Sequence, residues 1–292
     1  MTAKQKFTIA YSTCPNDTFI FNALAHNLID TQTLKFNVTL ADVETLNQRA
    51  EHGLYDITKL SFAAFGKVRH KYKLLRVGAA LGRGCGPLFI SRPGSSFDIC
   101  GKQVIAVPGL GTTAYHLLCL YLDDLSKKNG ESINHQIIPM PFEKIMPHVL
   151  SGKSKFGVII HEGRFVYEKM GFGLVRDLGH WWEENTLLPI PLGCIAIKKE
   201  IETEHALHIQ HIILKSLHHA RKNPDAVSGY IKKNAQELDD DVIEQHINLY
   251  VNEFTENLGK TGEKAVRVFF EKNEKAGMIA KNNEELFISD MI

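Results

Sequence analysis

The stretch GVIIHEGRFVY, Gly157 to Tyr167, contains a short apolar run, then a histidine, then a segment with helical character. The apolar run predicts a buried strand that ends at His161, and the residues after it predict a helix. In open α/β sheets, ligands bind outside the carboxyl ends of the strands. We therefore predict that His161 is a functional residue. A hydrogen-bonded structural histidine at a strand end stays open as the alternative at this point.

On both sides of this stretch, short β-rich runs alternate with helical segments. The predicted strands cover residues 7–12, 34–41, 56–61, 73–81, 88–92, 103–108, 133–140, 156–161 and 193–199, and a further short strand or edge is predicted at residues 173–179. This alternation is typical of the α/β fold class, and the chain after Glu200 is predicted to be helical. HWWEENTLLPIPLG, residues 180–193, has two tryptophans, two prolines and little periodicity, so we expect a loop that lines a ligand site.

The order of these segments predicts an α/β fold of two lobes with a ligand cleft between them. RPGSSFDICGK, residues 92–102, is rich in Pro, Gly and Ser, and we expect it to be the first crossing between lobes. The first lobe would hold residues 1–97 and 195–292, and the second, inserted lobe residues 98–194. The crossings would lie near residues 93–101 and 189–194. The default role of the C-terminal helices is to cover the sheet of the first lobe.

Composition and charge narrow the class of partner. The chain has 292 residues, 44 % of them hydrophobic, and a formal net charge of +1. A near-neutral chain has no general attraction for nucleic acid or an anionic membrane surface. There is no apolar run of about 18 residues and no signal-peptide pattern at the N-terminus, so we expect a cytoplasmic protein. The five scattered cysteines predict neither a disulfide framework nor a structural zinc site, and the oligomeric state stays open.

Three helix starts carry polar side chains that could meet a ligand. TCPNDTF places Asn16 and Asp17 after the first strand, KLSFAAF places Ser61 after the third, and PGLGTTAYHLL places Thr112 and Thr113 after a strand of the second lobe. Backbone N–H groups at a helix start favour anions such as carboxylates. Each position could equally be an ordinary helix cap or turn.

Two further motifs have weaker functional interpretations. Gly109-x-Gly111-x-x-Ala114 formally matches a dinucleotide fingerprint, but Pro108 interrupts its entry and no acidic residue follows at the required spacing. Its glycines instead allow the backbone to come close to a ligand. Cys85 lies in the glycine-rich loop GRGCGP and is expected near the cleft, without the neighbouring base that a nucleophile needs.

The remaining histidines do not have the spacing of a metal site. One amphipathic helix holds His205, His208, His211, His218 and His219, and no carboxylate stands at metal-ligand spacing from them. We expect a solvated helix face there and no metal site.

Six stretches in order resemble the 1,4-dihydroxy-6-naphthoate synthase family of the futalosine pathway to menaquinone. They are STCPNDTFIF, DITKLSFAAF, GRGCGPL, GLGTTAYHLL, GVIIHEGRFVY and NTLLPIPLGCIAIKK, from Ser12 to about Lys199. The resemblance implies a fold like the type II periplasmic binding proteins and a cytoplasmic enzyme. The implied activity is a lyase that opens cyclic dehypoxanthinylfutalosine and releases the dihydroxynaphthoate.

The resemblance also implies roles for particular residues. It makes His161 the proton acceptor, and it gives the substrate contacts to Lys59, Leu60, Ser61, Thr112 and Thr113. Possible pocket walls are Asn16, Asp17, Cys85 and Leu188, the last in the LLPIPLG segment. Glu162 is an alternative base or the residue that orients His161.

The implied chemistry agrees with the residue types. A carboxylate substrate suits a helix N-terminus near Ser61 or Thr112. A buried neutral histidine can remove the proton that the breaking of a carbon–carbon bond requires. Formation of a second aromatic ring drives the reaction, so we expect neither a metal nor a redox cofactor.

Two other functions stay open on this fold. The sibling chorismate dehydratase of the same pathway differs in substrate and does not need the histidine of the I-I-H-E-G stretch. A non-catalytic protein that binds a small organic acid is the alternative from another class, and the lack of a signal peptide argues against it.

Overall fold

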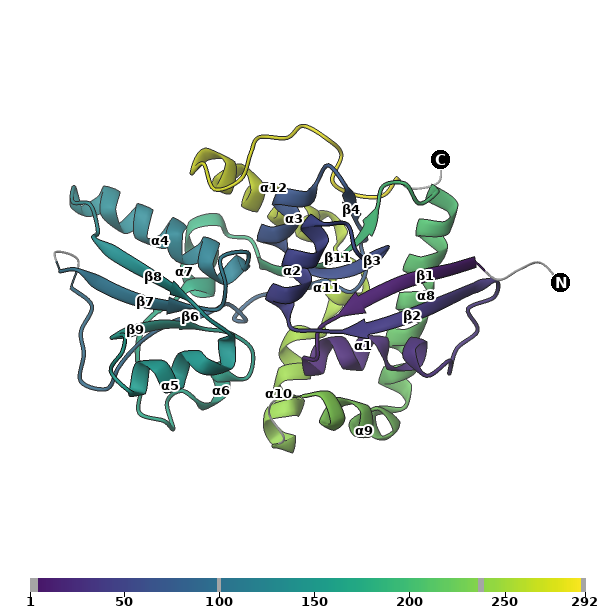
Figure 1. Cartoon of the computed structure of the whole chain (residues 1–292), viewed down its shortest axis with the longest axis horizontal. Helices are drawn as coiled ribbons and strands as arrows, with labels where there is room; N and C mark the ends of the chain where they lie inside the picture. The colour runs from purple at the N-terminus through teal and green to yellow at the C-terminus, as the bar shows by residue number, and fades with distance from the viewer. Residues whose placement is uncertain (1–4, 99–100, 236–238, 290–292) are drawn as a thin grey trace.

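The computed structural model describes residues 5–98, 101–235 and 239–289, and its strands form two sheets, one in each lobe (Figure 1). The first sheet has the order β2-β1-β3-β11-β4, with β5 paired to β11. Its strands are β1 Gln5–Tyr11, β2 Leu34–Leu40, β3 Ile57–Ser61, β4 Tyr72–Leu74, β5 Ala80–Gly82 and β11 Ile190–Lys198. The second sheet has the order β10-β6-β9-β7-β8. Its strands are β6 Leu88–Ser91, β7 Gln103–Val107, β8 His135–Pro139, β9 Phe156–Ile159 and β10 Gly173–Asp177.

Helices cover both faces of each sheet. Those within the lobes are α1 Pro15–Ala25, α2 Val43–Glu51, α3 Phe62–Val68, α4 Thr113–Asn129, α5 Ile145–Leu150, α6 Gly163–Val166 and α7 Leu178–Thr186, with a 3-10 turn at Phe142–Lys144. The C-terminal helices are α8 Thr203–Lys222, α9 Pro224–Asn234, α10 Asp240–Tyr250, α11 Glu253–Glu256 and α12 Gly259–Lys275. In the second lobe, α4 lies on the opposite face of the sheet from α5 and α6 (Figure 1). The predicted α/β class with two lobes is confirmed.

Local signals explain where several helices begin and end. Asp42 caps α2, because its carboxylate accepts hydrogen bonds from the backbone N–H groups of Glu44 and Thr45. Thr112 caps α4, and Gly130 ends that helix with a φ of 70°. Along β1, alternating residues point their apolar side chains to one buried layer, as the period of a strand requires.

The first crossing between lobes lies earlier than the sequence predicted. β6, residues Leu88–Ser91, pairs with β9 and β10, so it belongs to the second sheet. The chain therefore crosses between Gly82 and Leu88, and the expected crossing near residues 93–101, two of which lie outside the described residues, is corrected. The return comes before Ile190, because all of β11 pairs in the first sheet. The pattern of a strand does not say which sheet supplies its hydrogen-bond partners.

Two other expected elements differ from the structure. The segment expected to be a loop, residues 180–193, instead holds most of α7, which Asp177 caps through the N–H groups of Gly179 and His180. Trp182 on this helix is fully buried and packs 5.9 Å from Phe269, ring centre to ring centre. Residues 73–81, expected to be one strand, contribute to β4 and β5, which both pair with β11.

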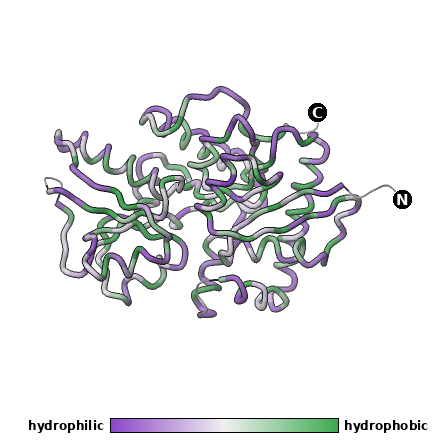
Figure 2. Tube along the Cα trace, viewed as in Figure 1, coloured by the Kyte–Doolittle hydropathy of each residue, from purple (hydrophilic) through white to green (hydrophobic). Residues whose placement is uncertain are grey.

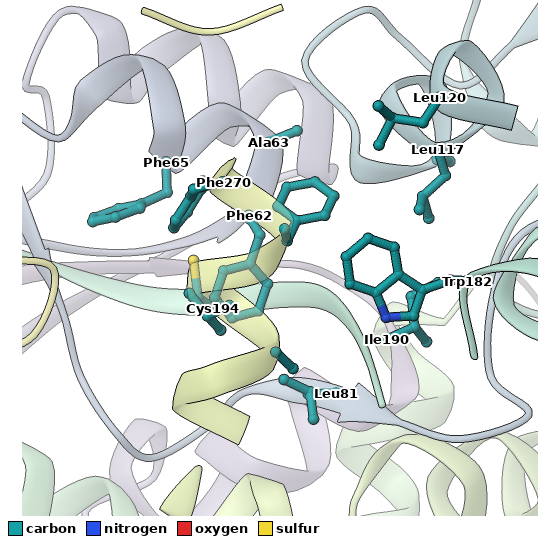
Figure 3. Close-up of a cluster of buried hydrophobic side chains, with 14 of the residues drawn as sticks. Phe62, Ala63, Phe65, Leu81, Leu117, Leu120, Trp182, Ile190, Cys194 and Phe270 are labelled. Carbon is teal, nitrogen blue, oxygen red and sulfur yellow. The ribbon is translucent and has the colours of Figure 1, made fainter. Parts of the chain in front are cut away.

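One hydrophobic core connects the two lobes beside the cleft. It joins Phe62 and Phe65 of α3 with Phe270 of α12, Leu117 of α4 and Trp182 of α7 (Figure 3). Apolar segments run through the sheets of both lobes, while many outer loops are hydrophilic (Figure 2). α12 touches α3, α4 and β11, so a C-terminal helix bridges the lobes. Within the described ranges, no helix is long and apolar enough to cross a membrane.

Candidate active site

A cavity between the lobes gathers most of the residues that the sequence singled out. It has about 650 Å³ of empty space, including its opening to solvent. Residues from both lobes line it: Ser12, Asn16, Asp17, Val43, Lys59, Ser61, Ala80, Cys85, Pro87, Thr112, Thr113, Ala114, Ile160, His161, Leu192, Gly193, His246 and Tyr250. Binding sites for small molecules are commonly clefts between lobes or domains, where a few polar groups face an apolar lining.

Two of the predicted residues do not line this cavity. Side chains alternate along β3, so Lys59 and Ser61 face the cavity while Leu60 points to the other side and is fully buried in the core. Leu188 is also buried in that core, below α7. The side chains of Leu60 and Leu188 are therefore not part of the cavity lining, which corrects the prediction from the sequence.

His161 stands just beyond β9, a central strand of the second sheet. Its backbone is in the left-handed region, with a φ of 55°. The Sγ atom of Cys14 lies 3.5 Å from Nδ1 and 3.7 Å from Nε2 of His161, and the Phe142 ring packs edge-on at 4.9 Å. Burial lowers the pKa of His161 to about 4; the Asp17 carboxylate opposes this shift and the Lys59 ammonium adds to it. The imidazole is therefore neutral at neutral pH.

Asp17 and Lys59 form a buried ion pair on the facing wall. Lys59 Nζ lies 2.8 Å from Asp17 Oδ1, and both side chains are at most 5 % exposed. Asp17 Oδ2 also accepts hydrogen bonds from the backbone N–H and the hydroxyl of Ser12. The sequence left Asn16 and Asp17 open as helix caps, but neither is the N-cap of α1. The cap position is Cys14, and Pro15 begins the helix. Asp17 is instead the counter-charge of Lys59.

The three hydroxyl groups of the predicted anion site differ in whether the hydroxyl proton is already used in a hydrogen bond within the protein. Thr112 Oγ1 donates to the carbonyl of Gly109 at 2.9 Å, and Thr113 Oγ1 donates to the carbonyl of Leu192 at 2.8 Å. Ser61 Oγ accepts from Asn47 Nδ2 at 3.2 Å and donates to none of the described residues. Although Ser61 is the cap position of α3, its side chain does not cap the helix. Ser61 thus has the hydroxyl proton that a ligand can use.

The glycine-rich entry to α4 meets a carboxylate of the first lobe. Glu44 Oε1 accepts a hydrogen bond from the backbone N–H of Gly111 at 3.1 Å, and Oε2 accepts from Asn47 Nδ2 at 3.0 Å. A Cβ added to Gly109 would lie 2.5 Å from Cδ of Glu44. The close approach that these glycines were predicted to allow is therefore made by Glu44, and neither glycine lines the cavity.

Sequence reasoning missed a wall of the cavity that comes from the C-terminal helices. α10 contributes His246, which is fully buried, and Tyr250 one turn later. Burial raises the pKa of Tyr250, so its hydroxyl keeps its proton. Both residues stand on the buried face of an amphipathic helix with Val242 and Ile243, and a histidine among apolar positions was the available signal.

Two remaining candidates have restricted chemistry. Burial raises the pKa of Cys85 to about 12, so its thiol is not a thiolate nucleophile at neutral pH. Glu162 is buried next to His161 and lies outside the lining of the cavity. Among residues 5–98, 101–235 and 239–289, no three His, Cys, Asp or Glu side chains converge as metal ligands would.

The chain is similar along most of its length to two curated proteins. Both are named 1,4-dihydroxy-6-naphthoate synthase, one from Thermus thermophilus and one from Streptomyces coelicolor. The Thermus protein is 40% identical over 280 residues, which cover 96% of this chain and 98% of that protein. The Streptomyces protein is 41% identical over 271 residues, which cover 93% and 94%.

Solved structures show the same fold in more distant proteins. AF1704 from Archaeoglobus fulgidus is 32% identical with a TM-score of 0.85, over 94% of this chain and 98% of that one. The alkanesulfonate-binding protein SsuA from Xanthomonas axonopodis pv. citri is 13% identical with a TM-score of 0.70, over 96% of each chain. The Candida albicans CA3427 product, of the generic periplasmic binding protein fold, is 12% identical with a TM-score of 0.65, over 98% of each. The predicted fold like the periplasmic binding proteins is confirmed.

The family match covers nearly the whole of both lobes. The model of a family described as menaquinone biosynthesis matches residues 7–275, which include His161, the Asp17–Lys59 pair and α10. Together with the two relatives, this match shows that the chain belongs to the menaquinone biosynthesis family.

Proposed function

We propose that this protein is a carbon–carbon lyase, a 1,4-dihydroxy-6-naphthoate synthase, with His161 as its proton acceptor. In this reaction cyclic dehypoxanthinylfutalosine opens and releases the dihydroxynaphthoate. The names of the two relatives support the reaction. The observation that carries the proposal is His161 itself, a neutral imidazole on left-handed backbone that lines the cavity between the lobes.

Proton removal is the step that His161 supplies. A neutral imidazole keeps a lone pair on one ring nitrogen, and that nitrogen can take a proton from the substrate. With its pKa at about 4, the imidazole of His161 is a weak base. A bound carboxylate substrate adds negative charge to the cavity and acts to raise this pKa, the more weakly the farther the carboxylate lies from His161. Binding of substrate thereby strengthens the base that acts on it.

The substrate carboxylate is expected at the opposite end of the cavity, between Ser61 and the N-terminus of α4. The hydroxyl of Ser61 is free to donate, and the first N–H groups of a long helix have no partner within the helix. Lys59 is not required as the counter-ion of the substrate carboxylate, because Asp17 already balances its charge. This placement leaves the reacting end of the substrate at His161.

The reaction is tested by incubating the protein with cyclic dehypoxanthinylfutalosine and following dihydroxynaphthoate by mass and fluorescence. We expect turnover without added metal or redox cofactor. A folded sample that binds the compound without converting it would support a solute-binding protein instead. Conversion of chorismate in a parallel sample would identify the sibling dehydratase.

The role of His161 has its own test. His161→Gln should lower kcat by about 100- to 10,000-fold, the range of general base catalysis, and leave the fold intact. His116→Gln is the matched control, because His116 is buried with a pKa of about 4 but does not line the cavity. A near-normal rate for His161→Gln, with a lost rate for Glu162→Gln, would assign the base to Glu162.

A further inference from the structure

A second histidine faces the same cavity as His161 and has no role in the proposed reaction so far. His246 comes from α10, is fully buried, and lines the cavity. Its ring lies nearly parallel to that of His161, with the ring centres 6.0 Å apart and an angle of 22° between planes. Burial, and then His161 and Lys59, lower the pKa of His246 well below its usual value, so the ring stays neutral.

A chain of hydrogen bonds decides which nitrogen of His246 carries the proton. Asn16 Nδ2 donates to Asp17 Oδ1 at 2.9 Å, which turns the amide oxygen of Asn16 toward His246. That oxygen lies 3.0 Å from His246 Nε2 and can only accept, so Nε2 carries the proton. Nδ1 is left with a lone pair and no proton.

The lone pair of Nδ1 has nothing to accept. Nδ1 is buried and has no hydrogen-bond partner among the residues that the structure describes. A buried polar atom without a partner costs about 1–3 kcal/mol, so each one needs an explanation. Among the described residues, five side chains have such an atom, and of these only His246 lines the cavity. Because the ring lines the cavity between the lobes, a ligand bound there can supply the missing donor.

We propose that His246 is a substrate-binding residue, which accepts through Nδ1 a hydrogen bond from a hydroxyl group of the bound ligand. The inference rests on the proposed function, since that reaction supplies a ligand with both a carboxylate and hydroxyl groups. Ser61 and α4 then hold the carboxylate, His161 takes the proton, and His246 recognises a hydroxyl. The Asp17–Asn16 pair is a positioning element that keeps Nδ1 in the accepting form.

The test compares two ligands that differ only in hydroxyl groups. 1,4-Dihydroxy-6-naphthoate carries them, while 2-naphthoate has the same rings and carboxylate without them. Binding is measured by calorimetry for the wild type, His246→Phe, His246→Gln and the control His116→Phe. The wild type and the control should prefer the dihydroxy compound, and His246→Phe should lose about 5- to 10-fold of that preference. His246→Gln should keep part of it, because its amide can both donate to Asn16 and accept from the ligand.

A measurement on the wild type does not depend on whether a variant folds. In protein with ¹⁵N-labelled histidines, the dihydroxy compound should move the Nδ1 resonance of His246 upfield, and 2-naphthoate should leave it in place. An unmoved Nδ1 resonance with the dihydroxy compound bound, or an equal preference in the wild type and His246→Phe, would overturn the role of His246 alone. Failure of both naphthoates to bind to the wild type would overturn the proposed function, and this inference with it.

Discussion

The backbone of His161 is strained in a way that suits its position in the site. Left-handed backbone costs a non-glycine residue roughly 1–2 kcal/mol, and histidine is among the residues that adopt it more often than most. The described residues include other non-glycine residues with positive φ, at Asn27, Gln32 and Leu187, but these do not line the cavity. The turn at His161 follows the carboxyl end of the buried strand β9 and places the imidazole in the lining of the cavity.

The ion pair of Asp17 and Lys59 sets the electrostatics opposite His161. Removing one partner of such a buried pair costs about 3–5 kcal/mol, because the other charge stays buried alone. Asp17 also holds Ser12 and Asn16 by hydrogen bonds. The carboxylate of Asp17 thus has three effects. It holds the start of α1 by hydrogen bonds, it balances the charge of Lys59, and through Asn16 it fixes the tautomer of His246.

The hydroxyl of Ser61 is predicted to bind the substrate carboxylate. Ser61→Ala should raise KM by about 10-fold, the usual effect of losing a hydrogen bond to a charged group. Stability should change little, since Asn47 Nδ2 keeps Glu44 as an acceptor. Steady-state kinetics and thermal unfolding of the variant check both effects.

Thr112→Ala is the matched control for Ser61. Its hydroxyl donates to Gly109 and caps α4 through the N–H of Tyr115, so the variant should lose about 0.5–2 kcal/mol of stability. Its KM should change less than that of Ser61→Ala. The reverse order of the two KM values would move the carboxylate contact from Ser61 to Thr112.

At the scale of elements, the entry to α4 is held by the first lobe. Glu44 of α2 accepts a hydrogen bond from Gly111, so a carboxylate of one lobe fixes the start of a helix in the other. Thr112, Thr113 and Ala114 at this helix start line the cavity. The geometry of the expected carboxylate site therefore depends on the contact between lobes.

Gly109→Ala is predicted to disturb this entry. The φ of Gly109 is 104°, which strains any L residue, and the new Cβ would collide with the Glu44 carboxyl group. We expect a loss of roughly 1–3 kcal/mol in stability and a higher KM for the substrate. Chemical unfolding and kinetics measure the two quantities.

Gly130→Ala, at the other end of α4, is the control that separates the effect of the collision with Glu44 from the effect of backbone strain. Gly130 also has a positive φ, of 70°, but a Cβ there would meet no atom within 4 Å. This variant should lose only about 1 kcal/mol and keep a normal KM. Equal stabilities and equal KM values for the two variants would mean that Glu44 yields freely and does not set the position of α4.

At the scale of the whole molecule, neutral histidines with lowered pKa values lie where the lobes meet. His116 of α4 bonds Asn273 of α12 through Nδ1 at 2.7 Å, and burial lowers its pKa to about 4. His161 and His246 lie at the cavity between the lobes, with their pKa values also lowered by burial. Protonation of these rings would place positive charge inside the joint core.

The folded protein is predicted to lose stability in mild acid. The unfolded chain takes up protons on these histidines as pH falls below about 6.5, while the folded rings of His116 and His161 resist protonation until about pH 4. The contribution of these histidines to the free energy of unfolding is therefore complete above about pH 6.5. It falls between pH 6.5 and 4, by up to about 1.4 kcal/mol per pH unit for each histidine. Carboxylates with lowered pKa values, such as Asp56, add their loss only at lower pH.

Urea unfolding at a series of pH values measures this slope. His116→Gln should reduce it, because one of the three rings is then missing from the balance of protons. A free energy of unfolding that stays level from pH 7 to pH 5 would contradict the prediction.

The sequence by itself determined the class of the fold and much of one site. The alternation of strands and helices and the order of the family's stretches are local patterns, so they can be recognised without knowledge of distant contacts. His161, Lys59, Ser61 and Thr112 line the cavity because the carboxyl ends of strands and the starts of helices gather at one edge of each sheet.

Only the tertiary structure decided which partners these local elements meet. The strand at Leu88 joined the second sheet, residues 178–186 packed as a helix, and Leu60 turned away from the cavity. His246 reached the site from about 85 residues beyond His161, because α10 packs against α1 and next to β5. Periodicity along a chain reports how each segment is shaped and which of its faces is buried, but the identity of the neighbour on that face depends on packing between segments far apart in sequence.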